Sequence, residues 1–346
     1  SSHRSTGMLR LLCSILLVAC STAPLAGAQF VTGLPAPGAQ GLLAPGDRYE
    51  GVYTADGVSN GAQDFALWLP ESPPPPQGYP LAIFVPGGGW REPGPHGPEP
   101  TGLNRVLRRR GFAVARVRYS HSDLPGPTAG RFPAAEQDVQ AALQHFRFHA
   151  ATYRIDPARV FLNGRSAGAH SVQAAALWPD AADLTATDQR RESSRPTAVL
   201  LGSLGATHIP TLRQFVNSPI AAYLNGTSRL SQVPQARQVE ASPTTWIADR
   251  PDLARQIPFF IVSSPRAVEA PLGQPFALSA ADHNHDPWNA LTLWFLLRGT
   301  GGAQATHSFY LDTSAAEIEN AQLFEYQALW IDYILELQAR GLLAAG

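Results

Sequence analysis

The chain has 346 residues, of which 44% are hydrophobic and 15% charged, and its formal net charge is −1. A chain of this length buries a full-sized core, and α/β domains of this size are often undivided, so we expect a single domain. The near-neutral charge excludes a general attraction to nucleic acid or anionic lipid, and we expect a small-molecule partner instead.

Residues 1–28 are typical of an export signal that follows a short upstream remnant. Residues 8–10 (MLR) form a positive leader, and residues 11–20 (LLCSILLVAC) are apolar but too short to span a bilayer as a folded helix. An ordinary signal-peptidase motif ends at Ala28, and an alternative, lipoprotein-type motif (LVAC) ends at Cys20. We therefore expect an exported protein, secreted or periplasmic, which attaches to a membrane only in the alternative where Cys20 is lipidated.

Both cysteines of the chain, Cys13 and Cys20, lie in this leader. The mature chain, residues 29–346, therefore has no pair of cysteines to join, even in an oxidising compartment. Its stability has to come from the hydrophobic core.

Predicted strands alternate with predicted helices along the mature chain. Short apolar and β-branched runs, bounded by turn residues, predict strands at 64–70, 79–87, 112–119, 159–164, 197–203 and 257–264. Apolar residues at helical spacing predict helices at 132–157, 286–299 and 314–340. The alternation predicts an α/β fold with a mostly parallel central sheet that helices cover on both faces.

Two connections in this pattern stand out. The proline-rich segment 71–78 (ESPPPPQG) is a surface connection, because proline fixes φ and cannot continue a ladder, and we expect the strands on either side to pair as a hairpin. The segment at about 205–256 is long, joins two strands and has some helical periodicity. We interpret it as an insertion within the single domain that shapes a pocket beside the site.

The segment 160–172 (VFLNGRSAGAHSV) places Ser166 between Gly164 and Gly168, directly after an apolar run. A serine where a strand ends and a helix begins sits on a tight turn, and the flanking glycines leave the room that this turn needs. The turn presents Oγ above the carboxyl edge of the sheet, where the helix N-terminus also points its free amides. The spacing and context predict that Ser166 is a nucleophile, although G-x-S-x-G alone also occurs in ordinary surface turns.

A glycine-rich loop, residues 84–90 (FVPGGGW), follows an earlier predicted strand. Consecutive glycines let the backbone approach a reacting carbonyl, whose oxygen gains negative charge during acyl transfer and is stabilised by N–H groups. We expect the amides of Gly88 and Gly89, together with that of Ala167, to form an oxyanion hole. Trp90, beside this loop, is a candidate wall of the substrate pocket.

In motif order the chain resembles the α/β-hydrolase superfamily, and within it the esterases similar to hormone-sensitive lipase and the bacterial acyl esterases. The resemblance runs from roughly Phe65 to His307 and includes the glycine loop, the serine motif (GRSAG) and the segment 305–310 (ATHSFY). It implies hydrolysis of carboxylic esters, with acetyl and feruloyl esterases as a sub-case. One departure is Pro86, which stands where the family usually has histidine; it affects the hydrogen bonds that anchor the loop rather than the glycine amides.

The resemblance also implies the order serine, acid, histidine along the chain. His307, which precedes the final predicted helix, is the expected general base. The acid is expected on the connection after the strand 257–264, where it fixes the tautomer of the imidazole. Asp282 is the first choice because it lies a few residues before the next helix; Asp286 and Glu269 are the alternatives.

No cofactor is expected. His283, His285 and Asp286 are close in sequence, but alternating residues point apart unless the backbone is extended, and no further ligand cluster accompanies them, so we expect no metal site. The sequence thus predicts a serine carboxylic-ester hydrolase that forms an acyl-enzyme from a small ester. Alternatives are a formamidase or peptidase-like acyl hydrolase, and a secreted binding protein of hydrolase fold without catalysis.

Overall fold

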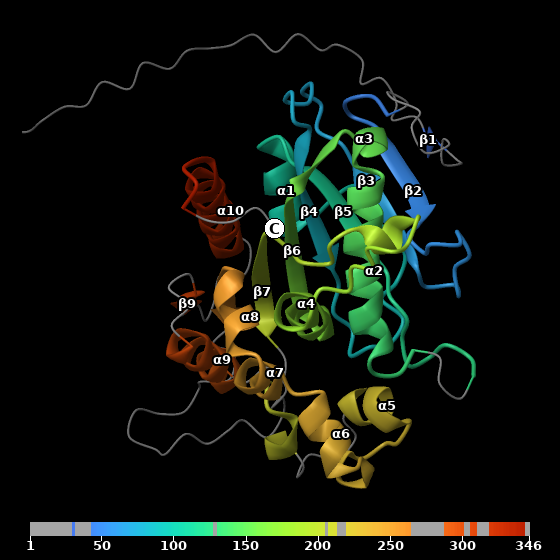
Figure 1. The fold of residues 1–346 in the computed structure, drawn as a ribbon, viewed down its shortest axis with the longest axis vertical. Coiled ribbons are helices and arrows are strands. Elements are labelled where there is room, and N and C mark those ends of the chain that lie inside the picture. The colour runs from blue at the N-terminus through green and yellow to red at the C-terminus, as the bar shows by residue number, and fades with distance from the viewer. Residues whose placement is uncertain are drawn as a thin grey trace, which may run out of the picture.

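The computed structural model describes residues 30–31, 43–126, 130–204, 207–212, 219–263, 287–300, 305–309 and 318–342. Within these residues, nine strands form one sheet in the order β1-β2-β3-β5-β4-β6-β7-β8-β9 (Figure 1). The strands are β1 (Phe30–Val31), β2 (Arg48–Val52), β3 (Asp64–Trp68), β4 (Tyr79–Val85), β5 (Ala113–Val117), β6 (Ile155–Ser166), β7 (Ala198–Leu204), β8 (Phe259–Ser263) and β9 (Ala305–Phe309). The helices are α1 (Gly102–Arg109), α2 (Ala134–Phe148), α3 (Ala150–Tyr153), α4 (Ala167–Leu177), α5 (Pro219–Asn225), α6 (Gln235–Glu240), α7 (Pro243–Asp249), α8 (Pro251–Gln256), α9 (Pro287–Gly299) and α10 (Ile318–Ala339).

Most of the sheet is parallel. The strands from β5 and β4 through β6, β7 and β8 to β9 run in one direction, whereas β3 is antiparallel to both of its neighbours, β2 and β5. The predicted α/β fold with a mostly parallel sheet is therefore confirmed.

The hairpin predicted across the segment 71–78 is wrong. β5 lies between β3 and β4: it pairs antiparallel with β3, where Phe65 is opposite Val117, and parallel with β4, where Leu81 is opposite Ala113. β4 is buried along nearly its whole length, which suits a strand with parallel neighbours on both sides. The chain crosses from β4 through α1 into β5, and this crossover separates β4 from β3.

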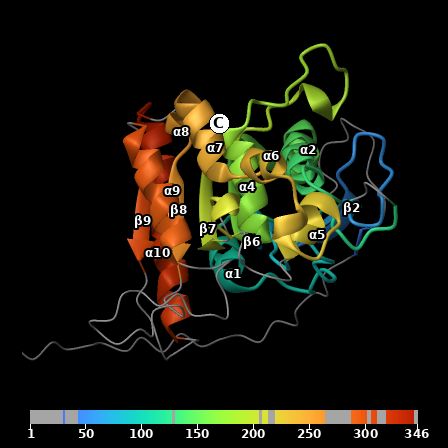
Figure 2. The same cartoon turned by 90° about the horizontal axis from the view of Figure 1, so that it is seen from below.

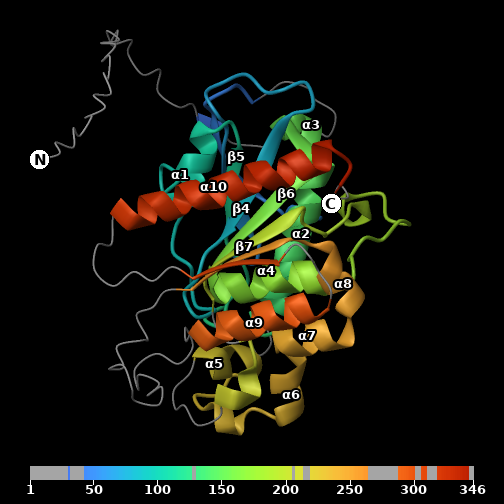
Figure 3. The same cartoon turned by 90° about the vertical axis from the view of Figure 1, so that its left-hand side faces the viewer.

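Helices cover both faces of the sheet (Figures 1 and 3). α2, α4, α7 and α9 contribute to the core on one face, and α1 and α10 pack together on the other. Residues of β6 show how the sequence produces two faces: Val160 and Leu162 belong to the first core, and Phe161 between them belongs to the second. This alternation has the period of two that a strand imposes on its side chains.

The predicted elements lie within a few residues of the observed ones, except for the helix predicted at 132–157. That helix ends as α2 at Phe148, α3 adds one short turn, and β6 already begins at Ile155. Arg154, directly after α3, has a left-handed backbone with a φ of 55°. Glycine is the usual residue in this conformation at a helix end, so the stop carries no local signal in the sequence.

The connection from β7 to β8 contains α5, α6, α7 and α8, with 3₁₀ turns at Ile209–Leu212 and Leu230–Gln232. α5 and α6 lie beyond the carboxyl end of the sheet (Figures 1 and 3), and the view from below shows them beside α2 and α4 (Figure 2). These helices therefore adjoin the edge of the sheet at which Ser166 ends β6. Among the helices that the structure describes, none combines the length and the hydropathy of a membrane-spanning segment.

Candidate active site

Ser166 stands at a sharp turn between a strand and a helix. It is the last residue of β6, Ala167 begins α4, and its backbone angles are φ 52° and ψ −118°. A non-glycine residue with positive φ costs about 1–3 kcal/mol and persists only where the surrounding structure holds it. The turn therefore has the geometry of the strained elbow that exposes a nucleophile at a sheet edge.

The flanking glycines are required by close packing beneath this turn. A Cβ on Gly168 would lie 2.1 Å from the carbonyl oxygen of Val85 and 2.5 Å from that of Pro86. A Cβ on Gly164 would lie 2.6 Å from the carbonyl oxygen of Gly168. The elbow thus packs directly on the backbone at the end of β4.

Replacement of Gly168 with alanine is expected to lower the free energy of unfolding by about 3 kcal/mol, because the new methyl group overlaps backbone atoms that cannot move independently. Urea unfolding measures the effect. Gly299→Ala is the matched control, since an added Cβ at Gly299 meets nothing within 4 Å. Equal unfolding midpoints for the two variants would contradict the packing argument.

The glycine loop lies against the elbow. A Cβ on Gly87 would approach the Cβ of Ser166 to 2.9 Å, and one on Gly89 would approach the Cβ of Pro219, the first residue of α5, to 2.9 Å. Gly88 is exposed and has a φ of 125°, and Gly89 has a φ of 65°, a conformation that glycine adopts without strain. The structure therefore brings together the loop, the elbow and the start of the β7–β8 connection.

The backbone of the loop is anchored on both sides. The hydroxyl of Tyr119 donates to the carbonyl oxygen of Pro86 at 2.9 Å, and burial, followed by the Glu136 carboxylate, raises the pKa of Tyr119 so that it stays a donor. The carbonyl oxygen of Trp90 accepts from the backbone N of Ser122 at 2.7 Å and from its Oγ at 2.9 Å. The segment after β5 thus supplies anchors for a loop in which Pro86 replaces the family's usual histidine.

Trp90 is buried, with 5% of its surface exposed, and contacts the rings of Tyr223 and His170. His170 is 2% exposed, with Nδ1 3.0 Å from Oε1 of Glu136 and Nε2 2.8 Å from the carbonyl oxygen of Ala241. Both ring nitrogens are therefore engaged away from Ser166, so His170 is a packing residue beneath the elbow. The ring of Trp90 belongs to the core in this structure, and its role as a pocket wall stays a prediction.

Glu136 and Tyr223 were not among the residues singled out from the sequence. Glu136 is completely buried in α2, and the hydroxyl of Tyr223 in α5 donates to its Oε2. Burial, and then the Glu136 carboxylate, raise the pKa of Tyr223 well above its usual value, so the phenol remains a donor. The available signal was the position of Glu136 three residues before Val139, which places a carboxylate on the apolar face of the predicted helix.

His307 lies within β9, two residues before that strand ends at Phe309. Along one row of the sheet, Gly164 is level with Leu201, Leu201 with Ile261, and Ile261 with His307. β9 is thus three strands from β6, which corresponds to about 14 Å across the sheet. Because β6 and β9 run in the same direction, the carboxyl ends of both strands lie at one edge of the sheet, although the strands are far apart in sequence.

The three candidate acids, Asp282, Asp286 and Glu269, lie outside the described residues, between β8 and α9, and so do His283 and His285. They follow β8, the strand next to β9 in the sheet. In the chain they lie between Ser166 and His307, as the predicted order serine, acid, histidine requires. In the described ranges, no group of three His, Cys, Asp or Glu side chains is placed to hold a metal ion.

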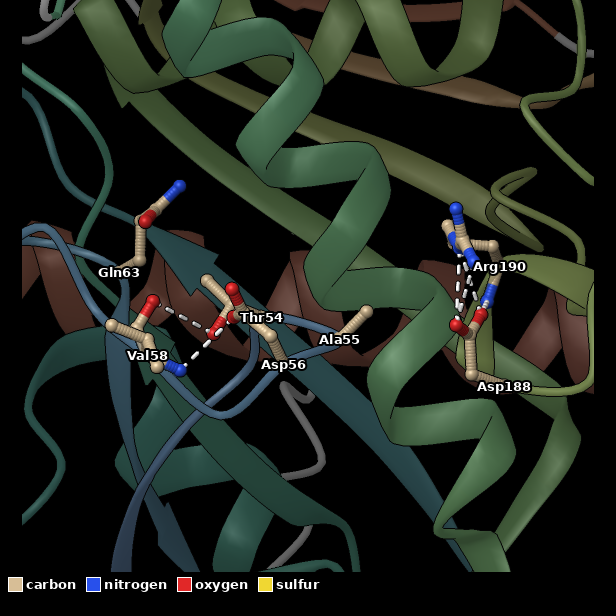
Figure 4. A pocket seen from close by; sticks show the side chains of 7 residues that line it. All are labelled: Thr54, Ala55, Asp56, Val58, Gln63, Asp188 and Arg190. Carbon is tan, nitrogen blue, oxygen red and sulfur yellow. Dashed lines mark hydrogen bonds and ion pairs between the residues drawn. The ribbon is translucent and has the colours of Figure 1, made fainter.

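A polar pocket of about 640 Å³ lies elsewhere on the molecule (Figure 4). It is lined by Thr54, Ala55, Asp56, Val58, Gln63, Asp188 and Arg190. On one side the turn after β2 is closed by its own hydrogen bonds, and on the other Asp188 pairs with Arg190 at 2.8 Å. β2 is separated from β6 by three strands, so this pocket is distinct from the candidate active site.

Comparison with known proteins gives one family and several solved structures of similar fold. The BD-FAE family model matches residues 67–278, more than half of the chain, and no curated protein matches its sequence. The acetyl ester-xyloside bifunctional hydrolase from Caldicellulosiruptor lactoaceticus is 17% identical, with a TM-score of 0.60 over 88% of this chain and 100% of that chain. Thermogutta terrifontis esterase 2 phosphoramylated by tabun is 19% identical, with a TM-score of 0.52 over 87% and 97%.

A further solved structure is longer than this protein. The chain spans 38% of the bifunctional GH43-CE protein from Bacteroides eggerthii, with a TM-score of 0.57, 17% identity and 84% of this chain covered. At these identities the likenesses establish the α/β-hydrolase fold.

Proposed function

The chain belongs to BD-FAE, an α/β-hydrolase esterase family, and on that premise we propose that it hydrolyses carboxylic esters through Ser166, His307 and Asp282. It is a serine hydrolase of the carboxylesterase type. What we propose beyond this enzyme class is which residues carry out the reaction and in which order they act.

The reaction has two acyl-transfer steps. Oγ of Ser166 attacks the ester carbonyl carbon while His307 accepts the hydroxyl proton, and His307 then protonates the alcohol as it leaves. Water, deprotonated by His307, hydrolyses the acyl-enzyme and restores Ser166, while Asp282 orients the imidazole and balances its charge. The N–H groups proposed to stabilise the oxyanion are those of Gly88, Gly89 and Ala167.

The observation that carries the proposal is the position of Ser166 beneath the glycine loop. Its φ of 52° is strained, and a Cβ on Gly87 would lie 2.9 Å from its Cβ. A serine in an ordinary surface turn needs neither the strain nor the loop. The strained backbone of Ser166 and its closeness to the glycine loop together support a nucleophile that lies beside a set of backbone N–H donors.

Hydrolysis of p-nitrophenyl esters from acetate to palmitate, measured for the wild type and Ser166→Ala, tests the proposal. We expect turnover that depends on Ser166 and labelling of Ser166 by a fluorophosphonate probe. Turnover of formamides or aminoacyl amides, but of no ester, would favour the formamidase or peptidase-like alternative. Neither turnover nor labelling would favour the non-catalytic binding protein.

Acetyl or feruloyl esters of plant polysaccharide are the proposed natural substrates, because an exported esterase meets such esters outside the cell. One structural neighbour is named for an acetyl ester-xyloside substrate, which supports this choice. Release of acetate or ferulate from esterified xylan measures it directly.

Replacement of Asp282 with asparagine is expected to lower kcat by about 10⁴-fold, because the imidazole loses the carboxylate that fixes its tautomer. The matched variants are Asp286→Asn and Glu269→Gln, which are expected to retain most of the activity. Steady-state kinetics on one ester separates the three. A large loss at Asp286 or Glu269 alone would reject Asp282 as the acid.

Export is proposed from residues 1–28. The mass of the mature N-terminus distinguishes the two forms of export. A start at Gln29 indicates a freely secreted or periplasmic protein, whereas a lipidated Cys20 indicates a membrane tether.

A further inference from the structure

We propose that Glu136, His170 and Tyr223 are positioning residues of the esterase site: as a buried cluster, they hold the indole of Trp90 and thereby fix the glycine loop against Ser166. We call these three residues the positioning cluster. Their proposed role in catalysis rests on the proposed function, whereas their effect on the loop is a property of the fold and is measured separately.

Trp90 needs an external restraint. It directly follows Gly89 and has a φ of 54°, a left-handed conformation that is an outlier for a bulky aromatic residue. Such a backbone persists only when the surrounding packing over-determines it. Within the described part of the chain, Nε1 of Trp90 has no hydrogen-bond partner, so ring contacts rather than a polar bond decide where the indole lies.

Two members of the positioning cluster supply those ring contacts. The ring of Tyr223 stacks on Trp90 with centroids 4.8 Å apart and planes 6° from parallel. The ring of His170 meets Trp90 edge to face, with centroids 5.3 Å apart and an angle of 82°. A ring held on its face and at its edge has little freedom to shift or turn.

The third member, Glu136, holds both of these rings. Its Oε2 accepts from the hydroxyl of Tyr223, and its Oε1 lies 3.0 Å from Nδ1 of His170. Oγ of Ser171 donates to the same Oε1 at 3.1 Å. A fully buried carboxyl group with several partners is costly to rearrange, because any partner that moves leaves a buried oxygen atom without its hydrogen bond.

The cluster joins the segments that meet at the loop. His170 lies in the first turn of α4, the helix that begins at Ala167 beside the nucleophile. Tyr223 lies in α5, whose first residue, Pro219, is so near the loop that a Cβ added to Gly89 would lie 2.9 Å from its Cβ. Glu136 ties both helices to α2. Loosening the cluster therefore shifts the loop donors relative to Ser166, and a displacement of about 1 Å in an active site costs on the order of 100-fold in rate.

The protein contains a matched control cluster. Nε2 of His145 lies 3.0 Å from the hydroxyl of Tyr153, and Nδ1 lies 2.9 Å from Oε1 of Gln189. These side chains are as buried as the positioning cluster. Tyr153 ends α3, shortly before β6 begins at Ile155, whereas Ser166 is the last residue of β6. The control cluster therefore lies at the opposite end of that strand from the nucleophile.

The experiment compares Tyr223→Leu with Tyr153→Leu, and Tyr223→Phe with Tyr153→Phe, in the full chain. Four quantities are measured: kcat and KM on p-nitrophenyl acetate, the urea midpoint, and hydrogen exchange of the amides from residue 87 to 91 by mass spectrometry. The phenylalanine variants keep the aromatic ring at each position, including the ring of residue 223 that stacks on Trp90, and serve if a leucine variant does not fold.

We expect Tyr223→Leu to lower kcat by about 10- to 100-fold with little change in KM, and to accelerate exchange in residues 87–91. Tyr223→Phe is expected to recover part of the kcat and part of the exchange protection, because it retains the ring that stacks on Trp90. The Tyr153 variants are expected to lower the urea midpoint and to leave both kcat and the exchange of residues 87–91 unchanged.

Exchange of residues 87–91 that is no faster in the Tyr223 variants than in the Tyr153 variants overturns the proposal, as does an equal fall in kcat for each matched pair. If the wild type hydrolyses no ester while exchange still rises only in the Tyr223 variants, the proposed function fails and the hold on the loop stands.

Discussion

Ser166→Ala is expected to lower kcat for ester hydrolysis by roughly 10⁴- to 10⁶-fold, because the variant has no hydroxyl with which to form the acyl-enzyme. Some rate above the uncatalysed reaction should remain, since backbone donors at the site still stabilise the oxyanion. Steady-state kinetics together with fluorophosphonate labelling measures the loss. A variant that keeps more than about a tenth of the wild-type kcat would exclude Ser166 as the nucleophile.

Ser166→Gly controls for damage to the fold. Glycine adopts the observed φ of 52° without strain, so this variant is expected to lose activity equally while its free energy of unfolding rises by about 1 kcal/mol. Urea unfolding separates the two effects. A fall in stability would show that the backbone at Ser166 is not strained.

His307→Ala is expected to cause a loss of similar size, because without a base the serine hydroxyl is not deprotonated and the leaving alcohol is not protonated. In the His307→Ala variant, the fall of kcat/KM at low pH should also disappear, since that fall reports protonation of the base. Added imidazole is expected to restore part of the rate in the variant.

His149→Ala is the control for this experiment. His149 is half-buried directly after α2, where it contacts the rings of His145 and Tyr153. This variant should keep the wild-type pH profile. A profile that keeps its acid limb in His307→Ala would assign the base to another residue.

Local patterns predicted the elements and the sites at which strands end. The run Val160–Phe161–Leu162 is apolar throughout because β6 is buried on both faces, and this feature is visible in the sequence. The glycines at 164 and 168 were also recognisable in the sequence, because a strand-to-helix turn this tight leaves no room for a side chain two residues before or after the serine. Both conclusions depend on residues that are neighbours in the chain.

The pairing of strands depended on contacts across the sheet. Nothing in the two runs joined by the segment 71–78 indicates that β5 inserts between them, because any apolar run can pair with any other. Likewise, the hydrogen-bond donors that anchor the loop at Pro86 and Trp90 come from the chain after β5. These donors can be assigned to the loop only when the strand order is known, because that order places the segment after β5 beside the loop after β4.

The residues of this chain determined an α/β fold, a serine at a strand-to-helix turn and a glycine loop, because each arises from the conformational limits of a short segment. The tertiary structure decided which side chains stand behind them. Glu136 and Tyr223 are 87 residues apart, and neither belongs to a motif. Their contact follows from burial: a carboxyl group removed from water has to find donors, and packing brings the hydroxyls of Ser171 in α4 and Tyr223 in α5 to Glu136.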